Sequence, residues 1–308
     1  MNTAMQAQAA ATPQPPATNG HDNTSSTTIS TISDSISPTA NASAGAAANA
    51  SSIVERVGEP RDVDADIVIP VYNEQEQLVE SVLRLMSHLA SSQIEGWAYT
   101  WQIVIADNAS TDDTWPIASR LAAQYPDRVR AVRIAAKGRG RALKLAWGES
   151  LAKIVAYMDV DLSTDIAQTG VLIGSLLYGG ADVSFGCRLF DESQVVRSTK
   201  REFISRTYNG MLRVLLGAAF HDAQCGFKAM TAPAARHLLP YVQDNEWFFD
   251  TELLLLAQAT NMRMYEFPVH WIEDPGTTVN IPDTVAKDLK GMWRMNGTLN
   301  RMRLAAAA

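Results

Sequence analysis

The sequence has few cysteines and no long apolar run. Cys187 and Cys225 are the two cysteines among 308 residues. They are too few for a disulfide framework and are not spaced as a metal pair, so we expect both in the core of a protein from a reducing compartment. No apolar run approaches the roughly 18 residues of a membrane span, and the start lacks the basic and apolar regions of a secretory signal. The sequence therefore predicts a cytoplasmic protein.

Basic residues are also outnumbered, with 26 Lys and Arg against 33 Asp and Glu, for a net charge of −7. A protein that holds a nucleic acid through a general basic surface needs the opposite balance. We therefore expect no nucleic-acid partner.

The first 52 residues contain no Lys, no Arg and no aromatic residue. Thirteen Ala and seventeen Ser and Thr dominate this segment, which cannot bury enough apolar area to offset the entropy of ordering it. We interpret residues 1–60 as a disordered, low-complexity tail.

From residue 66 onward, short apolar runs alternate with amphipathic stretches. The strand-like runs are 67–70, 101–107, 129–134, 154–158 and 182–185. The helix-like stretches between them are 74–90, 111–125, 141–152 and 166–177. This alternation of periods indicates βαβ units, so the sequence predicts an α/β domain with a mostly parallel sheet and helices on both faces.

Polar groups follow the strand-like runs, where ligands bind in open parallel sheets. In chain order they are Tyr72-Asn73-Glu74, Asp107-Asn108, Lys137-Gly138-Arg139, Asp159-Val160-Asp161 and Arg188. Loop ends are often polar without a function. Five groups in succession, most of them suited to a nucleotide, a metal or a phosphate, nevertheless indicate a binding site.

Asp159 and Asp161 form the strongest single feature. Two carboxylates separated by one residue, directly after a buried strand, point to the same side and can share a hard divalent cation. Mg²⁺ and Mn²⁺ take few protein carboxylates and fill their shell with water and diphosphate oxygens, which suits a nucleotide-sugar donor. The alternative is a helix N-cap formed by Asp161 or Ser163, which accounts for one of the two carboxylates.

Four motifs occur in the order seen in inverting family 2 glycosyltransferases of the GT-A fold, which the chain resembles. They are IPVYNE at 69–74, ADNASTDDT at 106–114, GRGRA at 138–142 and DVD at 159–161. The later segments DAQCGFK, WFFDTE and EFPV, which begin at 222, 247 and 266, resemble the dolichyl-phosphate glucosyltransferase and mannosyltransferase branch, nearer its glucosyl members. We therefore interpret residues 61–275 as a GT-A catalytic domain and 276–308 as a C-terminal amphipathic helical extension.

The resemblance implies a donor site and a metal. The donor site would comprise Pro70, Tyr72, Glu74, Asp107, Arg139 and Asp159. Asp107 would contact the base, and Asp159 with Asp161 would hold Mg²⁺ or Mn²⁺. Arg139 stands where family members often have Lys; it keeps the positive charge and can bind phosphate through two N–H groups.

The resemblance also implies that Arg188, Arg201 and Ser205 bind an acceptor phosphate. Arg201 and Ser205 are four residues apart, so on a helix both can face one anion. The alternative is that the basic residues between 197 and 213 only solvate a helix.

Asp250 and Glu252 are the predicted catalytic residues. A polyprenyl phosphate is already anionic near neutral pH and can attack without a base, so these carboxylates would orient the acceptor or stabilise charge. With a hydroxyl acceptor, one of them would be the general base. The alternative is an acidic first helical turn that complements the helix dipole.

Residues 285–304 contain five basic residues and one acidic residue, with apolar residues near helical spacing. A basic amphipathic helix of this kind can lie on an anionic membrane. Equally, its apolar face can pack back on the domain.

The leading hypothesis is a metal-dependent inverting glycosyltransferase at the cytoplasmic membrane face. It would move a hexose from a nucleotide sugar, UDP-glucose before GDP-mannose, to a polyprenyl or dolichyl phosphate. The alternatives are transfer to a hydroxyl of a glycan or glycolipid in cell-envelope polysaccharide synthesis, a non-catalytic nucleotide-sugar-binding protein, and a nucleotidyltransferase. The last usually has a glycine-rich loop where this chain has 70–74 (PVYNE).

Overall fold

A computed structural model describes residues 54–92, 98–273 and 281–307. The predicted tail up to residue 53 lies outside the described residues. An eight-stranded sheet in the order β1-β4-β3-β2-β5-β8-β6-β9 forms the centre of the fold. Its strands are β1 (Val54–Val57), β2 (Ala65–Val71), β3 (Trp101–Asn108), β4 (Val129–Ile134), β5 (Ile154–Met158), β6 (Val183–Cys187), β8 (Phe227–Thr231) and β9 (Met264–Pro268).

Strands β4, β3, β2 and β5 pair in parallel, and β6 pairs in parallel with β9. Strand β8 lies between β5 and β6 and is antiparallel to both. The mostly parallel α/β sheet predicted from the alternating runs is therefore confirmed. Parallel strands joined by crossover helices require cover on both faces.

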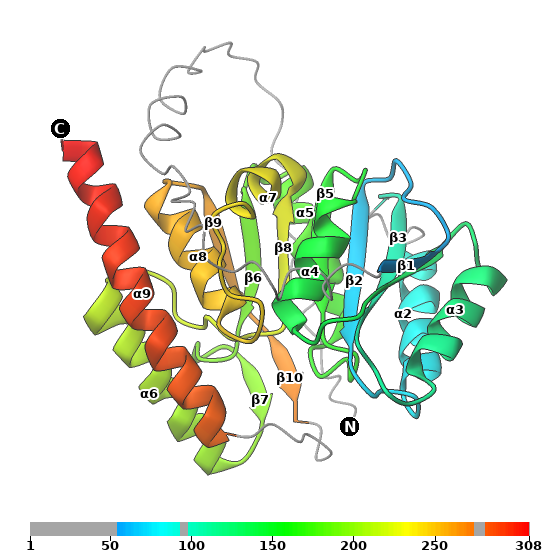
Figure 1. Ribbon diagram of the computed structural model, residues 1–308, viewed down its shortest axis with the longest axis horizontal. Coiled ribbons are helices and arrows are strands. Elements are labelled where there is room, and N and C mark those ends of the chain that lie inside the picture. Colours follow the sequence, from blue (N-terminus) through cyan, green and yellow to red (C-terminus); the bar gives the residue numbers. More distant parts are fainter. Residues whose placement is uncertain (1–53, 93–97, 274–280, 308) are drawn as a thin grey trace, which may run out of the picture.

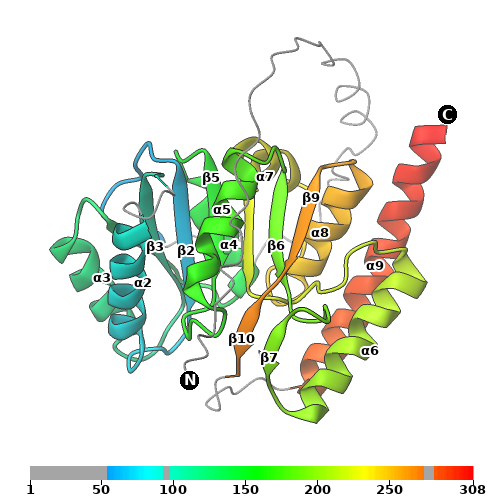
Figure 2. The same cartoon turned by 180° about the vertical axis from the view of Figure 1, so that it is seen from behind.

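Helices cover both faces of the sheet (Figures 1 and 2). One buried cluster packs the sheet against α2 (Leu78–Ser92), α3 (Thr114–Gln124) and α5 (Thr169–Leu177). The other packs it against α4 (Arg139–Gly148), α7 (Ala232–Leu238), α8 (Phe249–Ala259) and part of α6 (Thr199–Leu216). A short 3₁₀ helix, η1 (Ile166–Gln168), precedes α5. Cys187 and Cys225 are buried free thiols, as predicted.

The tail boundary at residue 60 is wrong, because Val54–Val57 form the edge strand β1. This strand pairs antiparallel with β4, from Val54 opposite Ile134 to Val57 opposite Ala131. Pairing with β4 satisfies the backbone hydrogen-bonding groups along one side of β1. The composition argument rested on the residues before it and does not detect this strand.

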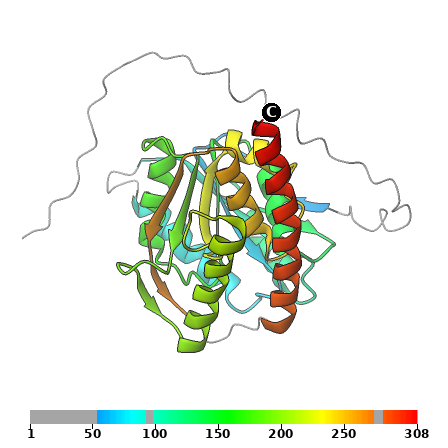
Figure 3. The ribbon, with the colours of Figure 1, turned by 90° about the vertical axis from the view of Figure 1, so that its left-hand side faces the viewer.

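The C-terminal helix α9 (Ile281–Ala307) runs alongside α6 and also contacts α8 (Figures 1 and 3). Met292, Met295, Leu299 and Met302 are buried in the core cluster that these helices share. The interpretation that this helix packs back on the domain is therefore confirmed for the face that carries them. Leu289 and Trp293 stay exposed, at 47% and 81%.

Beside the start of α6, two short strands, β7 (Gln194–Val196) and β10 (His270–Ile272), form a separate parallel pair. In Figures 1 and 2 this pair lies at the same end of the molecule as the first turns of α6 and α9. None of the described helices is long and apolar enough to cross a membrane.

Candidate active site

The carboxyl ends of β2 and β3 are tied to the start of α4 by one side chain. The Asn108 amide donates to the carbonyl of Val71 at 2.7 Å, and its oxygen accepts from the backbone N–H of Gly138 at 3.2 Å. Because Asn108 is buried, these bonds fix three loops relative to one another.

Two glycines let the start of α4 approach the loop and helix that carry Asp250. Gly138 has a φ of +148°, and a Cβ there would lie 2.4 Å from the carbonyl oxygen of Asn245. A Cβ on Gly140 would lie 2.6 Å from that of Phe249. The two glycines of the G-R-G motif therefore allow close packing, which places the central residue, Arg139, at the start of α8.

Arg139 bridges two carboxylates of the predicted site. Its guanidinium donates to Asp159 and to Asp250, each at 2.7 Å. It also lies over the rings of Tyr157 and Trp247, at 4.8 and 5.0 Å. Burial opposes the positive charge, but Tyr157 and the two carboxylates outweigh it and raise the pKa of Arg139 well above its usual value.

Asp250 is buried, and both of its oxygens are engaged. One accepts from Arg139; the other accepts from the Tyr157 hydroxyl and lies 3.5 Å from the Lys228 ammonium. Sequence reasoning missed Tyr157 and Lys228 as site residues, although Lys228 ends the QCGFK motif. Donors within the protein therefore already occupy both carboxylate oxygens of Asp250.

Glu252 does not join Asp250 in the site, contrary to the prediction of a catalytic pair. Its carboxylate accepts from Arg294 of α9 and from the backbone N–H of Asp244, at 2.7 and 2.8 Å. Both predicted residues lie in the first turn of α8, and side chains two residues apart on a helix face different directions. Glu252 therefore holds α9 in place.

Asp159 and Asp161 fit a divalent cation that takes few protein ligands. Asp159 lies against Gly226, because a Cβ on that glycine would come within 1.7 Å of Asp159 Oδ2. The side chain of Asp159 is 41% exposed. Asp161 accepts from the backbone N–H of Ser163 at 2.9 Å. The Ser163 hydroxyl is buried with no hydrogen-bond partner among the described residues. Among the described residues no cluster of three acidic, His or Cys ligands occurs.

The remaining donor-site predictions fall near the ends of β2 and β3. Asp107 is fully buried; burial raises its pKa, and Arg133 lies 3.3 Å away. The atom that faces Arg133 is Oδ2, which makes this ion pair but no hydrogen bond within the described ranges, and a contact of Asp107 with the base stays a prediction. The Lys137 ammonium stands 3.5 Å above the centre of the Tyr72 ring. Glu74 accepts from Gln77, and Pro70 is buried within β2.

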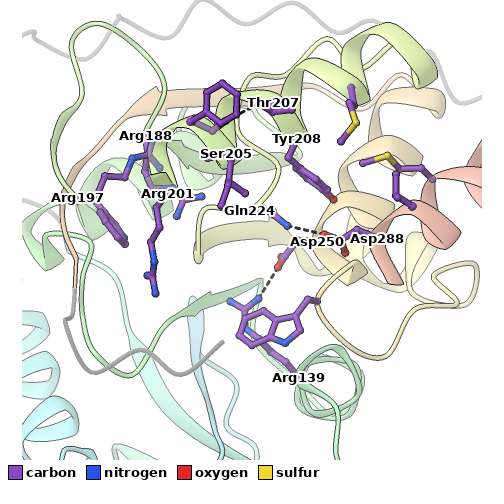
Figure 4. A pocket seen from close by; sticks show the side chains of 17 residues that line it. Arg139, Arg188, Arg197, Arg201, Ser205, Thr207, Tyr208, Gln224, Asp250 and Asp288 are labelled. Carbon is purple, nitrogen blue, oxygen red and sulfur yellow. Dashed lines mark hydrogen bonds and ion pairs between the residues drawn. The ribbon is translucent and has the colours of Figure 1, made fainter. Parts of the chain in front are cut away.

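A cavity of about 430 Å³ opens between the Arg139–Asp250 ion pair, α6 and α9. Figure 4 shows Arg188, Arg197 and Arg201 on one side of it and Arg139, Asp250 and Asp288 on the other. Apolar side chains of the two helices complete it: Phe203, Ile204, Met211, Leu289 and Met292.

Each of the three arginines on that side of the cavity has an acidic partner that fixes it. Arg188 makes a two-point ion pair with Asp222, at 2.8 and 3.0 Å. Although burial opposes it, Arg188 lowers the pKa of Asp222 to about 2. Arg197 pairs with Glu202, and Arg201 pairs with Glu273 at 2.8 Å. Arg197 was missed as a site residue, although it belongs to the basic stretch that the sequence displays.

Ser205 lines the same cavity as Arg201, as their spacing on α6 predicts. Its hydroxyl is buried and finds no partner in the described part of the chain. A buried hydroxyl without a partner costs free energy that a bound anion would recover. The structure therefore brings Arg188, Arg201 and Ser205 together at one cavity, and their role in binding a phosphate stays a prediction.

The mostly parallel sheet with helices on both faces agrees with the predicted GT-A fold. Residues 66–239 match the family described as Glycosyl transferase family 2. The match covers more than half of the chain, and the chain belongs to this family.

Two curated relatives and two solved structures of one protein illustrate the similarity. Glycosyltransferase AglD of Haloferax volcanii is 35% identical over 231 residues, covering 75% of this chain and 36% of the relative, so the chain spans about a third of that protein. The dolichyl-phosphate beta-glucosyltransferase of Homo sapiens is 26% identical over 253 residues, covering 75% of this chain and 78% of the relative.

Among solved structures, glucosyl-3-phosphoglycerate synthase from Mycobacterium tuberculosis has the same fold. Its complex with UDP matches with a TM-score of 0.55 and 18% identity, over 76% of this chain and 80% of that one. Its complex with Mn²⁺, UDP-glucose and phosphoglyceric acid matches with a TM-score of 0.51 and 17% identity, over 78% and 80%.

Proposed function

We propose that this chain is an inverting, metal-dependent hexosyltransferase that moves a hexose from a nucleotide sugar to a polyprenyl or dolichyl phosphate. The human relative named above is a dolichyl-phosphate beta-glucosyltransferase, which favours glucose over mannose and a lipid phosphate over other acceptors. The solved structure with the same fold was obtained with Mn²⁺ and UDP-glucose, which supports the choice of cofactor and donor.

The single observation that carries the proposal is the composition of the cavity. Arg139, Asp250 and the three arginines Arg188, Arg197 and Arg201 line one part of the cavity, and apolar side chains of α6 and α9 line the rest. A phosphate on an apolar chain needs these two environments side by side, because the arginines bind its charge and the apolar wall shields its hydrocarbon.

In the proposed reaction the acceptor phosphate oxygen attacks the anomeric carbon in line with the departing nucleoside diphosphate, which inverts the configuration. Arg188, Arg197, Arg201 and Ser205 hold the acceptor phosphate. Arg139 binds the diphosphate as its charge develops, and Asp250 with Tyr157 fixes the orientation of Arg139. A Mg²⁺ or Mn²⁺ ion held by Asp159 and Asp161 would supply further positive charge for the leaving group.

The pairing of Asp250 favours a phosphate acceptor over a hydroxyl acceptor. A hydroxyl must lose its proton to a base, whereas a phosphate monoester is already anionic near neutral pH. Both oxygens of Asp250 are already engaged, one by Arg139 and the other by the Tyr157 hydroxyl and Lys228, so neither is open to receive a hydroxyl proton. Transfer to a glycan or glycolipid hydroxyl is therefore the weaker candidate.

Contact with a membrane surface is part of the proposal. An apolar rim of five side chains, between 47% and 81% exposed, comes from β7, β10, the first two turns of α6 and the first half of α9: Val196, Phe203, Ile272, Leu289 and Trp293. Phe203 and Leu289 also line the cavity. The rim would rest on the cytoplasmic membrane face, so that the lipid tail need not enter water.

The experiment is a transfer assay with purified protein, Mg²⁺ or Mn²⁺, polyprenyl phosphate and, separately, labelled UDP-glucose and GDP-mannose. We expect label in the lipid fraction with UDP-glucose. Arg201→Ala and Ser205→Ala should lower turnover at least tenfold, whereas Lys200→Ala, an exposed neighbour outside the cavity, should not. Unchanged lipid labelling in both cavity variants would contradict the acceptor assignment.

Arg188 is less suited to this test. Its removal would leave Asp222, which is fully buried, without its partner, and breaking a buried ion pair costs about 3–5 kcal/mol. A loss of activity in that variant would therefore mix unfolding with loss of binding.

A further inference from the structure

Asp288 is a buried carboxyl that the C-terminal helix adds to the cavity. It is 4% exposed and lies on α9, in the wall that also contains Asp250 and Gln224. The Gln224 amide donates to its Oδ2 at 3.3 Å (Figure 4). Its Oδ1 is buried and has no hydrogen-bond partner among the described residues.

This position is unfavourable for a carboxylate. Burial, and secondarily the charge of Asp244, raise the pKa of Asp288 to about 7, while the bond from Gln224 opposes the shift. An unpaired buried oxygen adds a further cost. An Asn or an apolar residue would fill the same space at lower cost, so packing does not account for the carboxyl.

A pKa of about 7 leaves both the carboxylate and the protonated carboxyl present near neutral pH, so the best partner for Oδ1 is a group that can both donate and accept. A phosphate can accept only from the protonated form, and a prenyl chain has no polar group. The proposed contacts for the nucleoside, Tyr72 and Asp107, do not line this cavity. Of the parts of the two proposed substrates, the hexose remains, with hydroxyls that can both donate and accept.

We propose that Asp288, held by Gln224, binds a hydroxyl of the transferred hexose and so helps to select the sugar. The proposal rests on the proposed function and names a specificity residue for that site. Asp288 lies outside the region matched to the family, residues 66–239. Helix α9 would then complete the sugar subsite as well as covering the domain.

Equilibrium binding tests this without the acceptor. Calorimetry with Mn²⁺ would compare UDP-glucose with UDP, and GDP-mannose with GDP, for the wild type, Asp288→Asn and Asp288→Ala. We expect both variants to bind the nucleoside diphosphate within twofold of the wild type but the nucleotide sugar at least tenfold more weakly. The melting temperature of Asp288→Asn should be no lower than that of the wild type, because the neutral amide avoids the cost of burying a charge.

The matched control is Asp244→Asn, which removes a neighbouring carboxylate that does not line the cavity. It should leave the ratio of nucleotide-sugar to nucleotide affinity unchanged. An unchanged ratio in both Asp288 variants would overturn the proposal.

Deoxy donors identify the hydroxyl. With UDP-glucose analogues that each lack one hydroxyl, the wild type should lose at least tenfold in affinity for one analogue, and Asp288→Ala should show no such loss for that analogue. Equal losses in both proteins would also overturn the proposal. If the wild type makes no lipid product while the binding differences persist, the proposed acceptor fails and the role of Asp288 stands. If the wild type binds no nucleotide sugar, both fail.

Discussion

Arg294 of the C-terminal helix donates to Glu252 in the first turn of α8, at 2.7 Å. The side chain of Glu252 is 2% exposed, whereas that of Arg294 is 30% exposed. The ion pair therefore anchors α9 to the helix that presents Asp250, and it places Asp288 and Met292 in the cavity wall.

The first prediction separates Glu252 from Asp250. Glu252→Gln and Arg294→Ala should each lower the free energy of unfolding by about 1–3 kcal/mol, because a buried partner loses a charged hydrogen bond. Since neither residue lines the cavity, kcat should stay within a few-fold of the wild type at temperatures where the variants are folded. Urea denaturation and the lipid-transfer assay measure the two effects.

Asp250→Asn is the comparison for those variants. It should lower kcat at least a hundredfold at temperatures where the variant is folded, since the amide keeps the shape of the side chain while losing the charge that faces Arg139. If Glu252→Gln were as inactive as Asp250→Asn, the prediction that Asp250 and Glu252 act as a catalytic pair would stand.

The second prediction concerns the bridge made by Arg139. Arg139→Ala should lower kcat at least a hundredfold, equivalent to about 2.7 kcal/mol of transition-state stabilisation. Arg139→Lys should be intermediate, because one ammonium keeps the charge but cannot reach Asp159 and Asp250 as a planar fork does. Wild-type turnover in Arg139→Ala would remove this residue from the reaction.

Much of the sheet could be predicted from the sequence, because its central strands are buried and therefore appear as apolar runs. The runs at 101–107, 129–134 and 154–158 fall within β3, β4 and β5. Strands β1 and β8 lie outside the predicted runs and lack that signal. Strand β1 has two exposed central residues at a sheet edge, and β8 derives its direction from the chain reversal after α6, which no local pattern encodes.

The site was predictable where neighbours in sequence meet and unpredictable where distant segments meet. The spacing of Arg201 and Ser205 correctly places them at one cavity. The spacing of Asp250 and Glu252, two residues apart in a helix, argues against a shared face, and the motif resemblance concealed this. The contact of Arg139 with Asp250 joins positions 111 residues apart, and that of Gln224 with Asp288 joins positions 64 apart. Neither follows from local periodicity.

The third prediction tests the cradle around Asp159. In Gly226→Ala the new methyl group would collide with the Asp159 carboxylate, which must then leave Arg139 and the position proposed for the metal. The Mn²⁺-dependent affinity for UDP, measured by calorimetry, should weaken at least tenfold. Gly148→Ala is the matched control, since its Cβ meets no atom within 4 Å. Equal UDP affinity in the two variants would show that Asp159 need not occupy its present position.

The last prediction is a pH dependence of stability caused by Asp288. Its folded-state pKa of about 7 lies above the value of about 3.9 expected in the unfolded chain. Between these values the folded protein keeps a proton that the unfolded chain has lost, so the stability contribution falls as the pH rises from about 4 to about 7 and then levels off. The slope from this group cannot exceed about 1.4 kcal/mol per pH unit. Asp288→Asn lacks the titrating proton, so its stability relative to the wild type should rise across this interval. Urea denaturation of both proteins at pH 5, 6, 7 and 8 measures the difference, and a gap that does not change with pH would mean that Asp288 titrates near its ordinary value.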